Sequence, residues 1–176
     1  MKTKDNKYRV KEYFFLNPTA RLRVRQIEKE AKVPLPSAIR YAKELEKEGI
    51  LKSGLIAGIK LYSADRSSKR FLVEKMLFNI RQMHESGLVA YLVEEYNNSA
   101  IILFGSYARG EDIETSDIDL YIETNAKDIK TSSEFEKKLK RDVQIFAYKS
   151  AKDIKNKELA NSIINGIRLN GVVEAF

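Results

Sequence analysis

The chain has 176 residues, and 43% of them are hydrophobic, which is enough for one domain or two small domains with packed cores. It contains no cysteine, which excludes disulfides, thiolate zinc sites and cysteine nucleophiles and makes a reducing cytosol the expected location. No apolar run approaches the length of a membrane span or of a signal-peptide core, so we expect a cytoplasmic protein with no membrane partner.

Charge is distributed unevenly along the chain. Residues 1–66 contain 16 Lys and Arg against 8 Asp and Glu, a net charge of +8, whereas the remaining residues contain 16 against 17, a net charge of −1. A basic segment joined to a near-neutral one predicts a polyanionic partner for the first, most simply nucleic acid. We therefore predict a DNA-binding domain over 1–66, connecting helices over 67–97 and a second domain over 98–176.

Three helices and two strands are predicted in the basic segment. Apolar residues recur at helical spacing over 8–16 and 24–31, and a third helix over 37–48 ends at Gly49. Two short strands around a glycine-bearing turn follow, over 50–54 and 55–62.

The segment Leu-Glu-Lys-Glu-Gly-Ile-Leu-Lys at 45–52 resembles the end of the recognition helix and the start of the wing in prokaryotic winged-helix regulators. The resemblance covers about residues 8–64 and implies that the N-terminal half of the third helix enters the major groove of double-stranded DNA, with a homodimer as a further expectation. The candidate DNA contacts are Arg21, Arg23, Arg25, Ser37, Arg40, Tyr41, Lys43, Lys52 and Lys60. Winged helices also act as protein-interaction modules, which is the alternative interpretation.

Apolar residues at helical spacing predict a connecting or dimer-forming helix over 69–85 and another helix over 88–96. The only histidine, His84, lacks a second histidine or a cysteine as a partner ligand, so we expect a surface residue there.

The pattern with the most chemical content is Ile-Ile-Leu-Phe-Gly-Ser-Tyr-Ala-Arg-Gly at 101–110, followed by Ser-Asp-Ile-Asp-Leu-Tyr-Ile at 116–122. It predicts an apolar strand, a Gly-Ser turn and a second strand on which Asp117 and Asp119 share a face. Two adjacent carboxylates raise each other's pKa, and Mg²⁺ relieves that repulsion. Gly105 lets the backbone approach a ligand and Ser106 offers donors to phosphate oxygens, so the pattern predicts a site for a metal-bound nucleoside triphosphate.

The pair Gly105-Ser106, followed after ten residues by Asp117-x-Asp119, is similar to the signature of the DNA polymerase beta-like nucleotidyltransferase superfamily. It looks closest to the small minimal nucleotidyltransferases of prokaryotes, which include antitoxins paired with HEPN-type toxins. The resemblance implies an α/β (α+β) fold with a mixed sheet and flanking helices, Mg²⁺ with ATP or another nucleoside triphosphate, and a role for Arg109 in neutralising phosphate charge. The alternative is a polar hairpin that carries two aspartates by chance.

The superfamily usually carries a third carboxylate on a later strand, which we predict over 143–148 after a helix near 132–140. The matching position is Gln144, and Asp142 lies two residues earlier as a candidate catalytic replacement. Loss of a positioned general base typically costs about 10²–10⁴-fold in rate. The predictions left open are a slow enzyme or one rescued by Asp142, a regulator that senses nucleotide without turnover, and an antitoxin-like partner that modifies or caps a toxin.

The end of the chain predicts a helix over 156–166 and a short strand or turn over 167–171. A group of basic residues could attract an anionic acceptor, although such residues usually mark a solvated face: Lys127, Lys130, Lys137, Lys138, Lys140 and Arg141.

Overall fold

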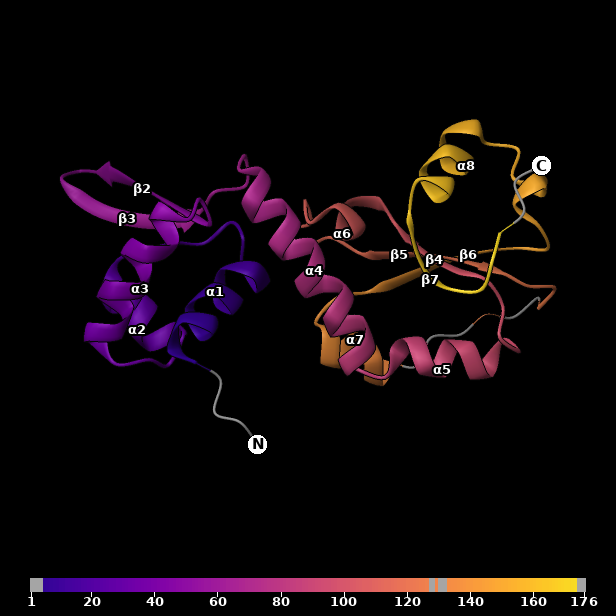
Figure 1. The fold of residues 1–176 in the computed structure, drawn as a ribbon, viewed down its shortest axis with the longest axis horizontal. Coiled ribbons are helices and arrows are strands. Elements are labelled where there is room, and N and C mark those ends of the chain that lie inside the picture. The colour runs from indigo at the N-terminus through magenta and orange to yellow at the C-terminus, as the bar shows by residue number, and fades with distance from the viewer. Residues whose placement is uncertain (1–4, 127–128, 130–132, 174–176) are drawn as a thin grey trace. The chain divides into compact units, whose positions relative to one another are not determined.

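The computed structural model describes residues 5–126, 129 and 133–173; Lys127 and Lys130 lie outside the described residues. The protein is α+β and divides into two compact units, Met1–Lys75 and Met76–Phe176, each with its own sheet (Figure 1). The division falls within helix α4, Lys69–Glu85. In the part of the chain that is described, no helix has the length and apolar character needed to span a membrane.

In the described part of the first unit, three helices precede α4, and three strands form an antiparallel sheet in the order β1-β3-β2. Its elements before α4 are α1 (Asn6–Leu16), β1 (Arg21–Leu22), α2 (Val24–Glu30), α3 (Leu35–Lys47), β2 (Leu51–Ile56) and β3 (Ile59–Ala64). This order agrees with the predicted three helices followed by two strands. The helices enclose a core of fully buried side chains that includes Phe14, Ile27 and Leu45.

The hairpin β2–β3 extends further than the sequence predicts. Strand β2 continues through Gly54 to Ile56, and the turn is formed by Ala57 and Gly58, both with positive φ. Two residues with positive φ are typical of the tight turns that match the twist of a hairpin, which explains why the turn is displaced beyond Gly54. Helix α3 also starts earlier than expected, because Pro36 lies in its first turn, where the missing backbone N–H costs little.

The second unit has a four-stranded sheet in the order β6-β5-β4-β7, in which β5 and β6 are parallel and the other pairs are antiparallel. Its elements after α4 are α5 (Leu88–Glu95), β4 (Ile101–Phe104), α6 (Gly105–Arg109), β5 (Ile118–Glu123), α7 (Ser133–Leu139), β6 (Val143–Tyr148), a 3₁₀ turn η1 (Ala151–Asp153), α8 (Lys157–Ile164) and β7 (Ile167–Asn170). The Gly-Ser turn expected after β4 is therefore the first turn of a short helix.

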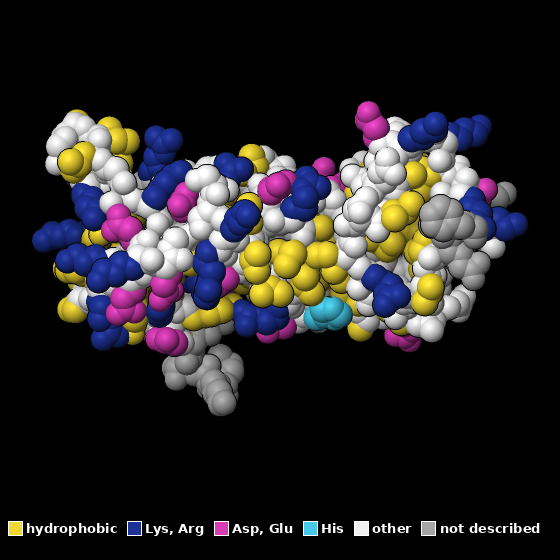
Figure 2. Space-filling model, turned by 45° about the horizontal axis from the view of Figure 1, so that its top comes forward, with side chains coloured by type: hydrophobic (Ala, Val, Ile, Leu, Met, Phe, Trp, Pro, Cys, Tyr) yellow, Lys and Arg dark blue, Asp and Glu magenta, His cyan; other side chains and the backbone are white. Residues whose placement is uncertain are grey.

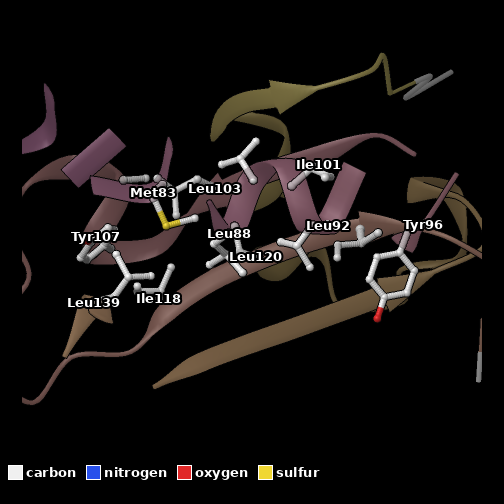
Figure 3. Close-up of a cluster of buried hydrophobic side chains, with 13 residues drawn as sticks. Met83, Leu88, Leu92, Tyr96, Ile101, Leu103, Tyr107, Ile118, Leu120 and Leu139 are labelled. Atoms are coloured by element: carbon white, nitrogen blue, oxygen red, sulfur yellow. The ribbon is translucent and has the colours of Figure 1, made fainter. Parts of the chain in front are cut away.

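Both faces of this sheet are covered, which is why every residue of β4 is buried. On one face Leu103 and Leu120 belong to a cluster with Met83, Leu88 and Leu92 from α4 and α5 (Figure 3). On the other face the alternate residues of the strands join side chains from η1 and α8, in a cluster of Ile102, Phe104, Tyr121, Ala151, Ile154 and Ile163. The strand ends that carry Gly105 and Asp119 are thus held by two cores.

Candidate functional site

Gly105 lies directly against the carboxylate of Asp119. The residue follows the last position of β4 with a φ of +73°, a left-handed conformation that favours glycine. A Cβ atom at this position would overlap Oδ2 of Asp119 and lie 3.0 Å from its Cγ. Any other residue at 105 would therefore both strain the backbone and displace Asp119.

The two predicted aspartates lie close enough to interact, although only one belongs to a strand. Asp119 is the second residue of β5 and is partly buried, whereas Asp117 is exposed and precedes the strand. Burial raises the pKa of Asp119 above its ordinary value, the charge of Asp117 raises it further, and Arg109 lowers it. The site therefore contains two carboxylates that repel each other. The backbone of Gly105 lies next to one of them, because glycine has no Cβ atom.

The neighbouring strand β6 presents an amide, not a carboxylate, beside Asp119. In the parallel pairing of β5 with β6, Gln144 is in register with Asp119, and the backbone N–H of Ile118 donates to the carbonyl oxygen of Asp142 at 2.8 Å. Residues in register on adjacent strands point to the same face of a sheet. Gln144 thus occupies the place next to Asp119, and Asp142 lies one position before β6, alongside Asp117.

A divalent cation fits the donors present at this site. Among the residues that the structure describes, no three His, Cys, Asp or Glu side chains converge as a ready metal site. Asp117 and Asp119 supply hard oxygen ligands, and their mutual repulsion would fall on binding Mg²⁺, which commonly takes one or two carboxylates together with substrate phosphates. Two protein carboxylates are consequently a reasonable ligand set for Mg²⁺ bound to a triphosphate.

Two pockets are lined by candidate residues of the site. The first, which we call the α8 pocket, has a volume of about 300 Å³. It is lined by Gly105 and Arg109 and by the polar residues Glu158, Asn161, Ser162 and Asn165 at α8 and its C-terminal end. Arg109 is exposed, and its Nε donates to Glu111 at 2.7 Å.

The second pocket, which we call the α7 pocket, has a volume of about 380 Å³. Asp117 and Asp142 line it from the strand ends, and residues at the C-terminal end of α7 and just beyond it, Lys137, Lys140 and Arg141, line it as well. The predicted candidates are therefore divided between two pockets, because Gly105 and Arg109 line the α8 pocket whereas Asp117 and Asp142 line the α7 pocket.

A buried polar cluster behind the site was not predicted from the sequence. The side-chain amide of Asn79 donates to Oδ1 of Asp112 at 2.8 Å and to the backbone oxygen of Tyr107 at 2.9 Å. Arg141 lies 3.9 Å from Oδ2 of the fully buried Asp112. The cluster connects α4, α6 and the loop before β5 to the residue next to Asp142, so it positions three segments of the site.

Comparison with protein-family models gives a match in the second half of the chain. Residues 87–169 match the family model for polymerase beta nucleotidyltransferases. This nucleotidyltransferase-like region runs from the start of α5 to β7 and contains the Gly-Ser pair, both aspartates and the α7 pocket. The predicted resemblance to the nucleotidyltransferase superfamily is confirmed for these residues, and the match supports a general transferase function. No characterised protein and no solved structure matched the chain.

The candidate DNA contacts lie outside the nucleotidyltransferase-like region, on the first unit. Figure 2 shows Lys and Arg side chains gathered over that unit. Most of the candidates are exposed, namely Arg21, Arg23, Arg25, Arg40, Lys43, Lys52 and Lys60, whereas Ser37 and Tyr41 are half-buried. His84, the cyan residue of Figure 2, is exposed as predicted.

Some of these basic residues already have acidic neighbours. Lys60 lies 3.4 Å from Glu46 and Arg40 lies 3.7 Å from Glu44, with the Arg40 guanidinium also 4.4 Å from the centre of the Tyr41 ring. Within the described part of the chain, Arg23, Arg25 and Lys43 make no ion pair. A polyanion could contact the latter group without first breaking an ion pair.

Proposed function

We propose that the protein binds a Mg²⁺-bound nucleoside triphosphate at Asp117 and Asp119 and transfers its nucleoside monophosphate to an acceptor hydroxyl. The observation that carries this proposal is the contact between the Gly105 backbone and the Asp119 carboxylate inside the nucleotidyltransferase-like region. A glycine next to a half-buried, repelled carboxylate brings backbone suited to phosphate binding next to a cation ligand.

The proposed reaction breaks the bond between the α-phosphorus and the oxygen bridging to the β-phosphate, and it forms a bond from the acceptor oxygen to the α-phosphorus. Pyrophosphate leaves with the electron pair. The proton of the acceptor hydroxyl passes to a base, for which Asp142 is the exposed carboxylate available on the β6 side. Bound Mg²⁺ supplies neutralisation of the phosphate charge.

The chain's own residues would hold the triphosphate on the Gly105 side. Ser106 offers a hydroxyl, and Arg109 offers a guanidinium that can exchange its exposed pairing with Glu111 for a phosphate at small cost. The α8 pocket continues from Gly105 and Arg109 toward amide and hydroxyl groups of the kind that hydrogen-bond a nucleobase. We assign the nucleoside to the α8 pocket.

A second candidate function is favoured by Gln144. Because the amide stands in register with Asp119, the strand lacks a carboxylate where a second cation or a general base would be expected. A protein without this carboxylate could bind a nucleotide and regulate its own binding to DNA without transferring the nucleotide. Pyrophosphate release above the uncatalysed rate excludes this reading.

We further propose that the first unit is a winged-helix module that binds double-stranded DNA through the N-terminal half of α3 and the hairpin β2–β3. The proposal is supported by the helix order, the antiparallel hairpin and the net charge of +8 on residues 1–66. The acidic far half of α3 is partly neutralised within the unit, because Glu48 lies 2.6 Å from Lys7. The basic half of the helix is therefore the expected DNA face.

The test of the transferase proposal compares the wild type with the double variant Asp117→Asn and Asp119→Asn. We expect the wild type to bind ATP in the presence of Mg²⁺ and to transfer labelled AMP to an acceptor, and we expect both activities to disappear in the variant while circular dichroism is unchanged. Equal ATP binding by the two proteins would overturn the site assignment. Binding without transfer would favour the nucleotide-sensing function.

A further inference from the structure

The α7 pocket has the form of an acceptor site with opposite charges at its two sides. Asp117 and Asp142 line it from the start of β5 and β6, where the reaction proposed above would take place, and Lys137 and Lys140 line it from the C-terminal end of α7. The nucleotide has a separate place, because Gly105 and Arg109 line the α8 pocket. We propose that the α7 pocket binds an acceptor that carries a phosphate group near its reacting hydroxyl.

This inference rests on the proposed function and names the class of its acceptor. A hydroxyl directed at the strand ends would lie beside Asp142, and a phosphate a few bonds away would reach the lysines. Nucleotides and the 3′ ends of nucleic acids both have a hydroxyl and a phosphate joined through one sugar. A neutral acceptor such as a free nucleoside or an unphosphorylated sugar would leave the lysines without a partner from the ligand.

The charges that line the pocket decide how an anion would bind. The acidic side chains are Glu114, Glu136, Asp117 and Asp142, and the basic ones are Lys137, Lys140 and Arg141. A cation held by Asp117 and Asp119 offsets the charge at the strand side, and Glu136 accepts the backbone N–H of Val143 at 3.1 Å. With Mg²⁺ bound, the wall formed by the end of α7 is the part of the pocket suited to a phosphate.

Two further observations concern the basic wall. Lys140 has a φ of +54°, a left-handed conformation at the end of α7 where glycine is favoured. A glycine at this position would relieve the backbone strain and would remove the positive charge. Next to it, the Arg141 side chain is only 7% exposed and is held by the buried Asp112, which fixes a cation at the base of the pocket.

The test uses the full chain with Mg²⁺ and compares the wild type with the double variant Lys137→Gln and Lys140→Gln. The matched control is Lys138→Gln on the same helix, which is exposed, pairs with Glu134 at 2.7 Å and does not line the pocket. Acceptors are a nucleoside 5′-monophosphate, an oligonucleotide with a free 3′ hydroxyl and an unphosphorylated nucleoside. The two phosphorylated acceptors distinguish a small metabolite from a nucleic-acid end.

We expect the double variant to lose about 10–100-fold in kcat/KM for a phosphorylated acceptor, because each lost charge-assisted hydrogen bond is worth roughly a factor of ten. The Kd for ATP should stay within twofold, and Lys138→Gln should behave as the wild type. An equal loss with the unphosphorylated nucleoside, weaker ATP binding in the double variant or no change at all would each overturn the inference.

Binding of inorganic phosphate, followed by NMR shifts of the pocket amides, separates this inference from the proposed function. If none of the three proteins transfers nucleotide, the proposed function fails. Phosphate binding that is lost in the double variant but retained in Lys138→Gln would still support the anion site. Phosphate binding that is equal in all three proteins overturns the site. The variant Lys140→Gly should bind phosphate less well than the wild type yet unfold at a higher temperature.

Discussion

The carboxylate of Asp119 is the residue on which the proposed site depends. It is partly buried, it is repelled by Asp117, and it lies so close to Gly105 that a Cβ atom at position 105 would overlap it. Burial is the largest cause of its raised pKa, and the charge of Asp117 is the second. A side chain arranged in this way lowers stability in the absence of a ligand and gains a favourable interaction when a cation binds.

We predict that Asp119→Asn raises the stability of the folded protein at neutral pH by on the order of 0.5 kcal/mol, a figure reduced for solvent screening. Because the pKa of Asp119 is higher in the folded than in the unfolded state, the penalty is present above the folded pKa and disappears as the pH falls toward the ordinary value of 3.8. Urea unfolding at pH 7.5 and at pH 3.5 measures the difference. Destabilisation at pH 7.5 would contradict the account.

We predict that Gly105→Ala abolishes binding of Mg²⁺–ATP and destabilises the protein by about 1–3 kcal/mol, because alanine at this φ is strained and its Cβ overlaps Asp119. The matched control is Gly54→Ala in β2, where an added Cβ meets nothing within 4 Å and the stability should change by less than about 0.5 kcal/mol. Thermal unfolding and ATP titration of both variants provide the measurement. Wild-type ATP affinity in Gly105→Ala would exclude the proposed role of the glycine.

At the scale of elements, local sequence patterns predicted most helices and strands but not β1 or α6. Helix α1 and strand β6 follow from apolar spacing, and β6 has the predicted bounds. The two-residue β1 depends on pairing with β3, which lies about forty residues later in the sequence. Helix α6 begins at Gly105, where the sequence predicted a Gly-Ser turn. These two elements are too short to carry a period, and their conformation depends on their tertiary neighbours.

The candidate site was predictable only in part for the same reason. The adjacency of Asp117 and Asp119 follows from their spacing. Gln144 was singled out only through the resemblance to the nucleotidyltransferase superfamily, and its register with Asp119 is given by the pairing of β5 with β6. The role of Asp112 was not predictable, because its partner Asn79 is 33 residues away and no local pattern marks either residue. The pockets likewise need the packed positions of α7 and α8.

We predict that Asp112→Ala destabilises the second unit by about 3–5 kcal/mol, because it removes the carboxylate that lies beside the buried Arg141 guanidinium and accepts a hydrogen bond from Asn79. Asp112→Asn should cost less, since its amide oxygen can still accept from Asn79. Urea unfolding of the two variants gives the comparison. Equal stability of Asp112→Ala and the wild type would show that the buried cluster does not hold the segments of the site in place.

For the whole molecule, the division of charge matches the division of proposed tasks. The net charge of +8 lies in residues 1–66, whereas the nucleotidyltransferase-like region at 87–169 falls within the remainder, which has a net charge of −1. A polyanion attracted by long-range electrostatics should therefore engage the first unit. The second unit would bind anions only through its local sites.

We predict that the double variant Arg23→Gln and Arg25→Gln weakens DNA binding and lowers the slope of log K against log salt by about 2, because each lost phosphate contact removes about 0.9 of a released counterion. The control variant Lys149→Gln and Lys152→Gln changes two exposed lysines of the second unit and should leave the slope unchanged. Fluorescence anisotropy with duplex DNA at several salt concentrations measures both. A smaller salt slope in the control variant alone would show that the second unit, and not the first, binds DNA.

The central claim is that the pair of aspartates binds a metal-bound nucleotide for transfer, and the most direct measurement is isothermal titration with Mg²⁺–ATP together with transfer of label from ATP. The wild type should bind and transfer, and the variant Asp117→Asn with Asp119→Asn should do neither while its unfolding temperature is at least as high. ATP binding that persists in the double variant, or transfer that does not depend on these two aspartates, would contradict the claim.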